Sequence, residues 1–226
     1  MPTLQRWRGR VHGVPRGVDL AVLYVLVVLG VFVALHTQSH PDRARFVQES
    51  STNLVNLRRS PFRVIVLSSV VVPGKAGLLI LVPLAAGLVL VQRWLGRAAT
   101  VVAFGFGHVG ATLVVATVLA AGLTHGRLDP SVARAPDVGV SYGLACLLGL
   151  LVARVPRWAR LPTSLLPLAG LVAVLLAEPD FTALGHIVAL VIGFGLAVLV
   201  HRGAEPVARS RPAGTGAGAG AGAVAD

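Results

Sequence analysis

Several apolar segments of this chain are too long to be core helices of a soluble domain. One runs over 18–37, and another runs over 64–91, which spans ~42 Å at the rise of an α-helix. Hydrocarbon offers no partners for backbone N–H and C=O groups, so segments of this kind cross membranes as helices. Hydrophobic residues make up 55% of the 226, and charged residues only 13%. The sequence therefore predicts an all-α integral membrane protein.

The apolar segments predict a six-helix transmembrane bundle within 18–200. The expected helices lie at about 18–37, 76–92, 98–122, 138–153, 163–177 and 182–200. Pro73-Gly74-Lys75 separates a short element at 64–72 from the second of these helices, in which Pro83 predicts a kink.

Three further segments are polar or of low complexity. The loop at 38–63 contains Leu, Val and Phe residues among its polar ones, which indicates a partly interfacial helix. Residues 1–17 form a basic N-terminal segment, which we expect to be cytoplasmic. Residues 201–226 end in a Gly/Ala-rich tail, which cannot bury apolar surface and is expected to be disordered.

The formal net charge of +11 arises from twenty basic residues, nineteen of them arginine, in short loops and at the chain ends. This distribution favours topology signals and contact with anionic lipids over nucleic-acid binding. Alternate sides of the membrane carry twelve and eight basic residues, and both termini are on the richer side. We therefore expect a multi-pass protein of the plasma (cytoplasmic) membrane, with both termini in the cytoplasm.

The sequence contains one cysteine, Cys146, which lies inside an apolar segment and allows no intrachain disulfide. It contains no Cys-x-x-Cys motif and no cluster of His and Cys residues. We accordingly expect neither a metal ion nor a cofactor.

Ser141 and His186 are the polar residues that could carry chemistry. With both termini inside, the fourth and sixth helices enter the membrane from the outer face. Ser141 lies four residues after Asp137, and His186 lies six residues after Asp180. Both side chains are then roughly 5–10 Å below the outer surface. An imidazole can take the proton that makes a serine hydroxyl nucleophilic. Alternatively, the serine is a packing residue that bonds to its own helix.

Small residues surround both positions at helical spacing, which lets two helices approach closely. They are Gly139, Gly143 and Ala145 near Ser141, and Ala189 and Gly193 after His186. Tyr142 is on another side of the helical wheel and receives no role.

Three supporting positions have two interpretations each. Asp137 and Thr182 each precede a site residue by four positions. Each either bonds toward the site or has a local role, Asp137 as an N-cap and Thr182 as a solvated first-turn residue. Thr182 would in the first case orient the imidazole. His108, closer to mid-membrane, is either a hydrogen bonder between helices, which we favour, or a third functional group or proton-relay member.

These features together resemble the rhomboid intramembrane serine proteases. The likeness rests on six helices, Gly139-Val-Ser141 on the fourth, and His186-x-x-Ala189-x-x-x-Gly193 on the sixth. Gln92-Arg-Trp-Leu-Gly96 is similar to the Glu-Arg-x-x-Gly turn that follows the family's second helix. The resemblance implies that Ser141 is the nucleophile and His186 the general base of a dyad that cuts a transmembrane-helix substrate near the outer face.

The same comparison supports an alternative function. Active rhomboids carry a His and an Asn one turn apart on helix two that help to hold the oxyanion, and the aligned stretch 75–82 has neither. Tyr142 also stands where a glycine commonly follows the serine. The alternative is a catalytically inactive rhomboid-fold protein that binds transmembrane helices as clients. A transporter is disfavoured, because only His108 is ionisable at mid-depth.

Overall fold

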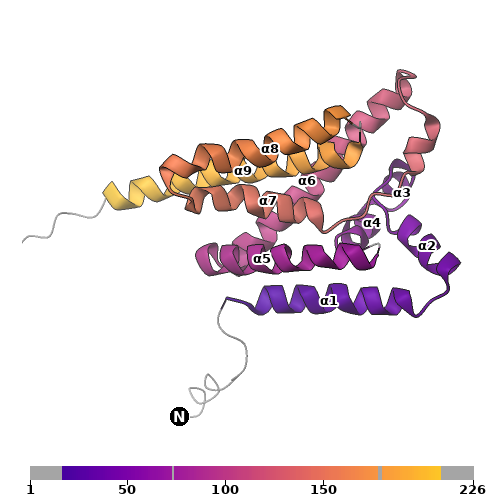
Figure 1. The fold of residues 1–226 in the computed structure, drawn as a ribbon, viewed down its shortest axis with the longest axis horizontal. Coiled ribbons are helices and arrows are strands. Elements are labelled where there is room, and N and C mark those ends of the chain that lie inside the picture. The colour runs from indigo at the N-terminus through magenta and orange to yellow at the C-terminus, as the bar shows by residue number, and fades with distance from the viewer. Residues whose placement is uncertain (1–16, 73, 178–179, 210–226) are drawn as a thin grey trace, which may run out of the picture.

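The computed structural model describes residues 17–72, 74–177 and 180–209, with side chains up to Arg202. These residues form helices and no strand, which confirms the predicted all-α fold (Figure 1). In chain order the helices are α1 (Asp19–His36), α2 (His40–Glu49), α3 (Leu54–Arg59), α4 (Pro61–Ser68), η1 (Lys75–Ile80), α5 (Leu81–Leu95), α6 (Arg97–Thr124), η2 (Pro130–Arg134), α7 (Ser141–Leu151), η3 (Val152–Arg154), α8 (Arg157–Ala177) and α9 (Phe181–Arg209).

Six apolar helical segments follow one another in the predicted order. Five are long enough to cross a membrane, namely α1, η1 with α5, α6, α8 and α9. The sixth, α7 with η3, covers Ser141–Arg154 and is shorter. It is also the most enclosed segment, since eight of the eleven residues of α7 are buried.

Helix boundaries differ from the prediction where the sequence pattern was ambiguous. The second apolar stretch begins as the 3₁₀ turn η1, so Pro83 falls in the first turn of α5, where a missing N–H costs nothing. The expected interfacial segment forms α2 and α3, whose N-caps Ser39 and Asn53 accept bonds from the first turn. α9 continues past residue 200 to Arg209. The predictions for 1–16 and 210–226 concern residues outside the described part.

α7 is at the centre of the fold. It packs against α9, α6 and α5, whereas α8 packs against α9 and η3 and contains no buried residue. Figure 1 shows α7 between α5 on one side and the α8–α9 pair on the other, with α1 alongside α5. The Asp19 carboxylate of α1 pairs with Arg97 at 2.6 Å and with Gln92, which ties α1 to the α5–α6 turn.

Glycines let α7 and α9 approach closely. A Cβ added to Gly193 would lie 2.9 Å from the Gly149 Cα and closer still to the Cys146 carbonyl oxygen. Both contacts are with backbone, so no side chain can move aside to make room. Small residues thus bring α7 and α9, the helices that carry Ser141 and His186, close together.

Candidate functional site

The segment before α7 is fixed to the loop between α2 and α3. The Asp137 carbonyl accepts bonds from the Thr52 backbone N–H at 2.8 Å and from the Thr52 hydroxyl at 3.0 Å. The Asp137 N–H donates to the Ser51 hydroxyl oxygen. Ser51, Thr52 and Asp137 are all buried. This network fixes where α7 begins, and therefore the height of Ser141.

The Asp137 carboxylate is itself enclosed. One of its oxygens accepts from the Thr52 hydroxyl at 3.2 Å, and the Tyr142 hydroxyl donates to the carboxylate at 3.2 and 3.3 Å. Burial raises the pKa of Asp137, the bonds from Thr52 and Tyr142 lower it, and the nearby charge of Asp180 adds to the rise. The two hydroxyls offset part of the cost of burying this carboxyl group.

These contacts exclude one of the two roles considered for Asp137. The side chain does not cap α7, because the N-cap residue is Val140 and no side chain bonds to the first turn of that helix. The carboxylate instead accepts from the hydroxyl at the far end of the Tyr142 side chain. The N-cap interpretation is therefore wrong, and the carboxylate bonds instead to Tyr142, the residue that follows Ser141.

Tyr142 is the residue that contacts His186. Its side chain is 2% exposed, and its ring centroid is 5.1 Å from that of His186 in an edge-to-face arrangement. The ring lies over Gly185, where an added Cβ would overlap it. The His108 ring centroid is 6.4 Å from that of Tyr142. The Tyr142 ring is thus close to both histidines, and closer to His186.

Ser141 is half-buried and faces a different direction. Among the described residues, no hydrogen bond joins its hydroxyl to His186 or to any other side chain. The Oγ atom turns back toward Gly139, since a Cβ added to that glycine would lie 2.9 Å from it. The two residues therefore lie on helices that pack against each other, α7 and α9, but in the described part of the chain they do not form the bond that a working dyad uses.

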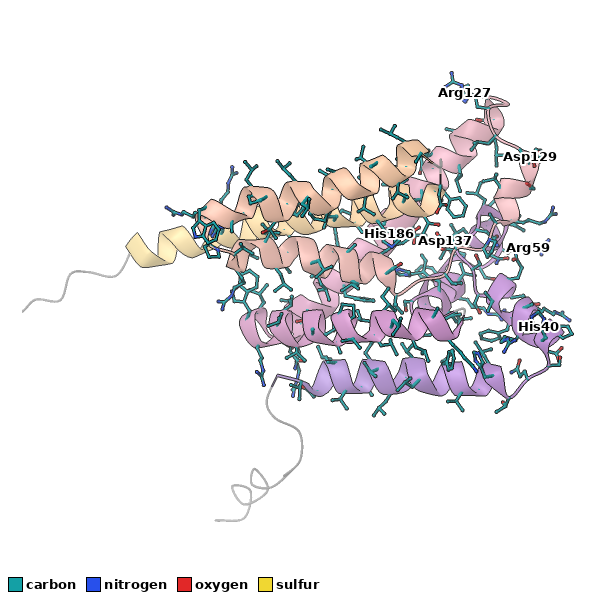
Figure 2. All side chains as sticks on the ribbon, viewed as in Figure 1. His40, Arg59, Arg127, Asp129, Asp137 and His186 are labelled. Carbon is teal, nitrogen blue, oxygen red and sulfur yellow. The ribbon has the colours of Figure 1, made fainter. Side chains whose placement is uncertain are left out.

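His186 is oriented by its own helix. Its Nδ1 atom is 2.8 Å from the Thr182 carbonyl oxygen, one turn earlier on α9. A proton on Nδ1 that donates to this carbonyl leaves Nε2 as a hydrogen-bond acceptor. The contact uses the Thr182 backbone and not its hydroxyl. Figure 2 shows Asp137 and His186 at the same end of α7 and α9.

His108 joins α6 to α4. Its Nε2 atom is 3.0 Å from the Ile65 carbonyl oxygen and 3.2 Å from the Ser68 hydroxyl oxygen. Its Nδ1 atom is buried and has no partner in the described part of the chain. A proton relay needs a partner at both ring nitrogens, so these contacts describe a hydrogen bond between helices.

One side of α7 remains open. Leu148, two turns after Ser141 on the same face, is 46% exposed although most of α7 is buried. Ser141 and Leu148 lie on this face of α7, which we call the open face.

Sequence reasoning missed Thr52 and Tyr142. The five-residue spacing between Asp137 and Tyr142 lets the tyrosine hydroxyl return to the carboxylate, and this spacing is visible in the sequence. Thr52 lies 85 residues from Asp137, and the sequence contains no local pattern that pairs them. In the described ranges, no group of three His, Cys, Asp or Glu side chains is placed to hold a metal ion.

Comparison with known proteins identifies one family. The family model described as rhomboid-like protein matches residues 16–206, which is most of the chain and includes α1 to α8 and α9 up to residue 206. Neither the curated proteins nor the solved structures gave a significant match.

Proposed function

Because the chain belongs to the rhomboid-like protein family, we propose that it binds transmembrane helices of partner proteins without cutting them. The observation that supports this proposal is the position of Tyr142. Its ring occupies the seam between α7 and α9 beside His186, and Asp137 holds its hydroxyl. A serine nucleophile needs its base within hydrogen-bond reach, and the group against His186 is this ring.

The lack of oxyanion donors supports the same conclusion. Residues 75–82 of η1 and α5 offer no His or Asn side chain, and His108 of α6 is bonded to α4. Loss of one oxyanion donor lowers a hydrolytic rate by ~10²–10³-fold. A serine without donors and without a bonded base would hydrolyse a peptide bond very slowly.

The open face of α7 is where a partner helix fits. Ser141 and Leu148 lie on it, and the Leu148 side chain is exposed. An apolar helix laid along this face would cover Leu148 and gain close van der Waals contact, which drives helix association in lipid. The ligand class is therefore a transmembrane helix with small or apolar side chains on one face.

The second candidate function is intramembrane proteolysis by Ser141 and His186 on a transmembrane-helix substrate. One observation favours it, namely the bond from His186 Nδ1 to the Thr182 carbonyl, which leaves Nε2 in the form that a general base requires. In this mechanism Nε2 takes the Ser141 proton as Oγ attacks the scissile carbonyl, and the protonated imidazole then gives that proton to the leaving amine.

A photocrosslinking amino acid at Leu148 distinguishes the two functions. We expect this position to capture a partner helix at full length, in equal amounts with Ser141 present or replaced by alanine. The matched control is Val102 of α6, which is 61% exposed and equally apolar but lies on another helix. We also expect no labelling of the solubilised protein by a fluorophosphonate.

Three results would contradict the proposal. Equal capture at Val102 and Leu148 would show contact with lipid neighbours and no binding site. A partner that is cut, and that becomes intact in Ser141→Ala, would establish the protease. Fluorophosphonate labelling that Ser141→Ala abolishes would do the same.

We further propose a plasma-membrane location with both termini in the cytoplasm. The turn between η3 and α8 is then inside, and the loop that contains η2 is outside. We expect a membrane-impermeant maleimide to label Ser131→Cys in intact cells, and to label Trp158→Cys only after permeabilisation. Cys146 is buried and gives little background. The reverse labelling pattern would invert the topology.

A further inference from the structure

A pocket of about 240 Å³ opens where the ends of η3, α8 and α9 meet. Its walls combine two kinds of side chain. Val152, Phe194 and Val198 supply apolar surface, and Arg160, His201 and Arg202 supply basic groups. A ligand that fits both must carry negative charge next to a hydrocarbon portion.

Arg160 is held in place before any ligand arrives. Its Nε donates to the Val155 carbonyl at 2.9 Å, and its Nη2 donates to the Ala153 carbonyl at 3.1 Å. A guanidinium has five N–H donors, so three remain for a ligand. Among the described residues, no carboxylate forms an ion pair with Arg160. The pocket therefore presents a fixed guanidinium to an anionic group.

The pocket lies at the depth of lipid headgroups. Trp158, at the start of α8, is 84% exposed, and Arg154 lies over the Trp94 ring with its Cζ 5.7 Å from the centroid. Tryptophan and arginine together mark a membrane–water interface. Figure 1 shows the α5–α6 turn, the α7–α8 turn and the far end of α9 at this same end of the molecule.

We propose that this pocket binds an anionic phospholipid, with its headgroup phosphate on Arg160 and Arg202 and an acyl chain along the apolar side chains of α8 and α9. Basic pockets between transmembrane helices recognise anionic headgroups in this way. A zwitterionic lipid also has a phosphate, but its ammonium group would approach the same basic side chains and be repelled. The site is separate from the open face of α7 and does not depend on the function proposed for it.

Native mass spectrometry of the full-length protein in detergent tests this proposal. Dioleoylphosphatidylglycerol and dioleoylphosphatidylcholine, which share their acyl chains, would each be titrated. We expect the phosphatidylglycerol to bind at least fivefold more tightly than the phosphatidylcholine. Arg202→Gln and Arg160→Gln should each weaken it about fivefold, the effect of one basic residue near an anionic headgroup. Arg160→Lys should recover less than half of that loss, because lysine lacks the rigid fork.

The matched control is Arg157→Gln, which removes a charge from the same end of α8 outside the pocket, and we expect its effect to be below twofold. Equal affinity for the two lipids would overturn the proposal, and this comparison needs no variant. An Arg157→Gln effect as large as that of Arg202→Gln would indicate diffuse attraction to a basic surface. Complete displacement of the lipid by an excess of inorganic phosphate, at constant ionic strength, would identify a small-anion site instead.

Discussion

Gly193→Val is expected to lower the free energy of unfolding by about 3 kcal/mol, because the new side chain has no room between α7 and α9. Its Cβ would lie 2.9 Å from both the Gly149 Cα and the Leu150 backbone nitrogen. Backbone atoms cannot rotate away, so the helices must separate and lose the contacts of the whole seam. Titration with SDS in mixed micelles, followed by circular dichroism, measures the change.

Gly195→Val is the matched control, on the same helix and two residues later. No heavy atom lies within 4 Å of a Cβ built there, so we expect a change below about 0.5 kcal/mol. If the two variants unfold at the same SDS fraction, close packing of α7 on α9 does not hold the fold together. The two variants also separate packing from helix propensity, because the chemical change is the same in both.

The helical fold could be predicted because the membrane limits the choices. Apolar segments of this length must be helices in a membrane, and counting them along the chain gives six. The prediction was less accurate at the ends of helices. Pro83 has the same sequence signature inside a helix as in a first turn, and its place in the first turn of α5 follows from the 3₁₀ turn before it. Local pattern cannot distinguish the two.

The candidate site was only partly predictable. Helical rise gives the depth of Ser141 and His186, and the small residues predict that their helices approach. The rotation of each helix about its axis is set by packing partners elsewhere in the chain. Tyr142 faces α9 because Gly185 leaves space for its ring and Asp137 accepts its hydroxyl bond. That rotation turns Ser141 toward the open face.

Asp137 has two separable roles in this arrangement. Its backbone groups bond to Ser51 and Thr52 and position the segment before α7. Its carboxylate bonds to the hydroxyls of Thr52 and Tyr142 and holds the tyrosine ring against His186. An alanine at this position would keep the first role and remove the second.

Asp137→Ala is therefore expected to lower the free energy of unfolding by about 3 kcal/mol, because the Tyr142 hydroxyl loses its partner and the Thr52 hydroxyl keeps only the Asp137 carbonyl. A buried hydroxyl without a partner costs about 1–3 kcal/mol. Tyr142→Phe, added to Asp137→Ala, removes the orphaned hydroxyl, so the double variant should be less destabilised than Asp137→Ala alone. The double-mutant cycle then measures the coupling between the two side chains.

Asp129→Ala is the matched control, since this aspartate is on the same loop but is exposed, and its carboxylate accepts one bond, from the Ser131 N–H at 2.8 Å, as the N-cap of η2. We expect loss of this cap to lower the free energy of unfolding by about 1 kcal/mol, well below the effect of Asp137→Ala. Strictly additive effects of Asp137→Ala and Tyr142→Phe would mean that the carboxylate does not hold the ring. The argument that Tyr142 keeps His186 from acting as the base for Ser141 would then fail. Proteolysis would become the better explanation of the pair Ser141 and His186.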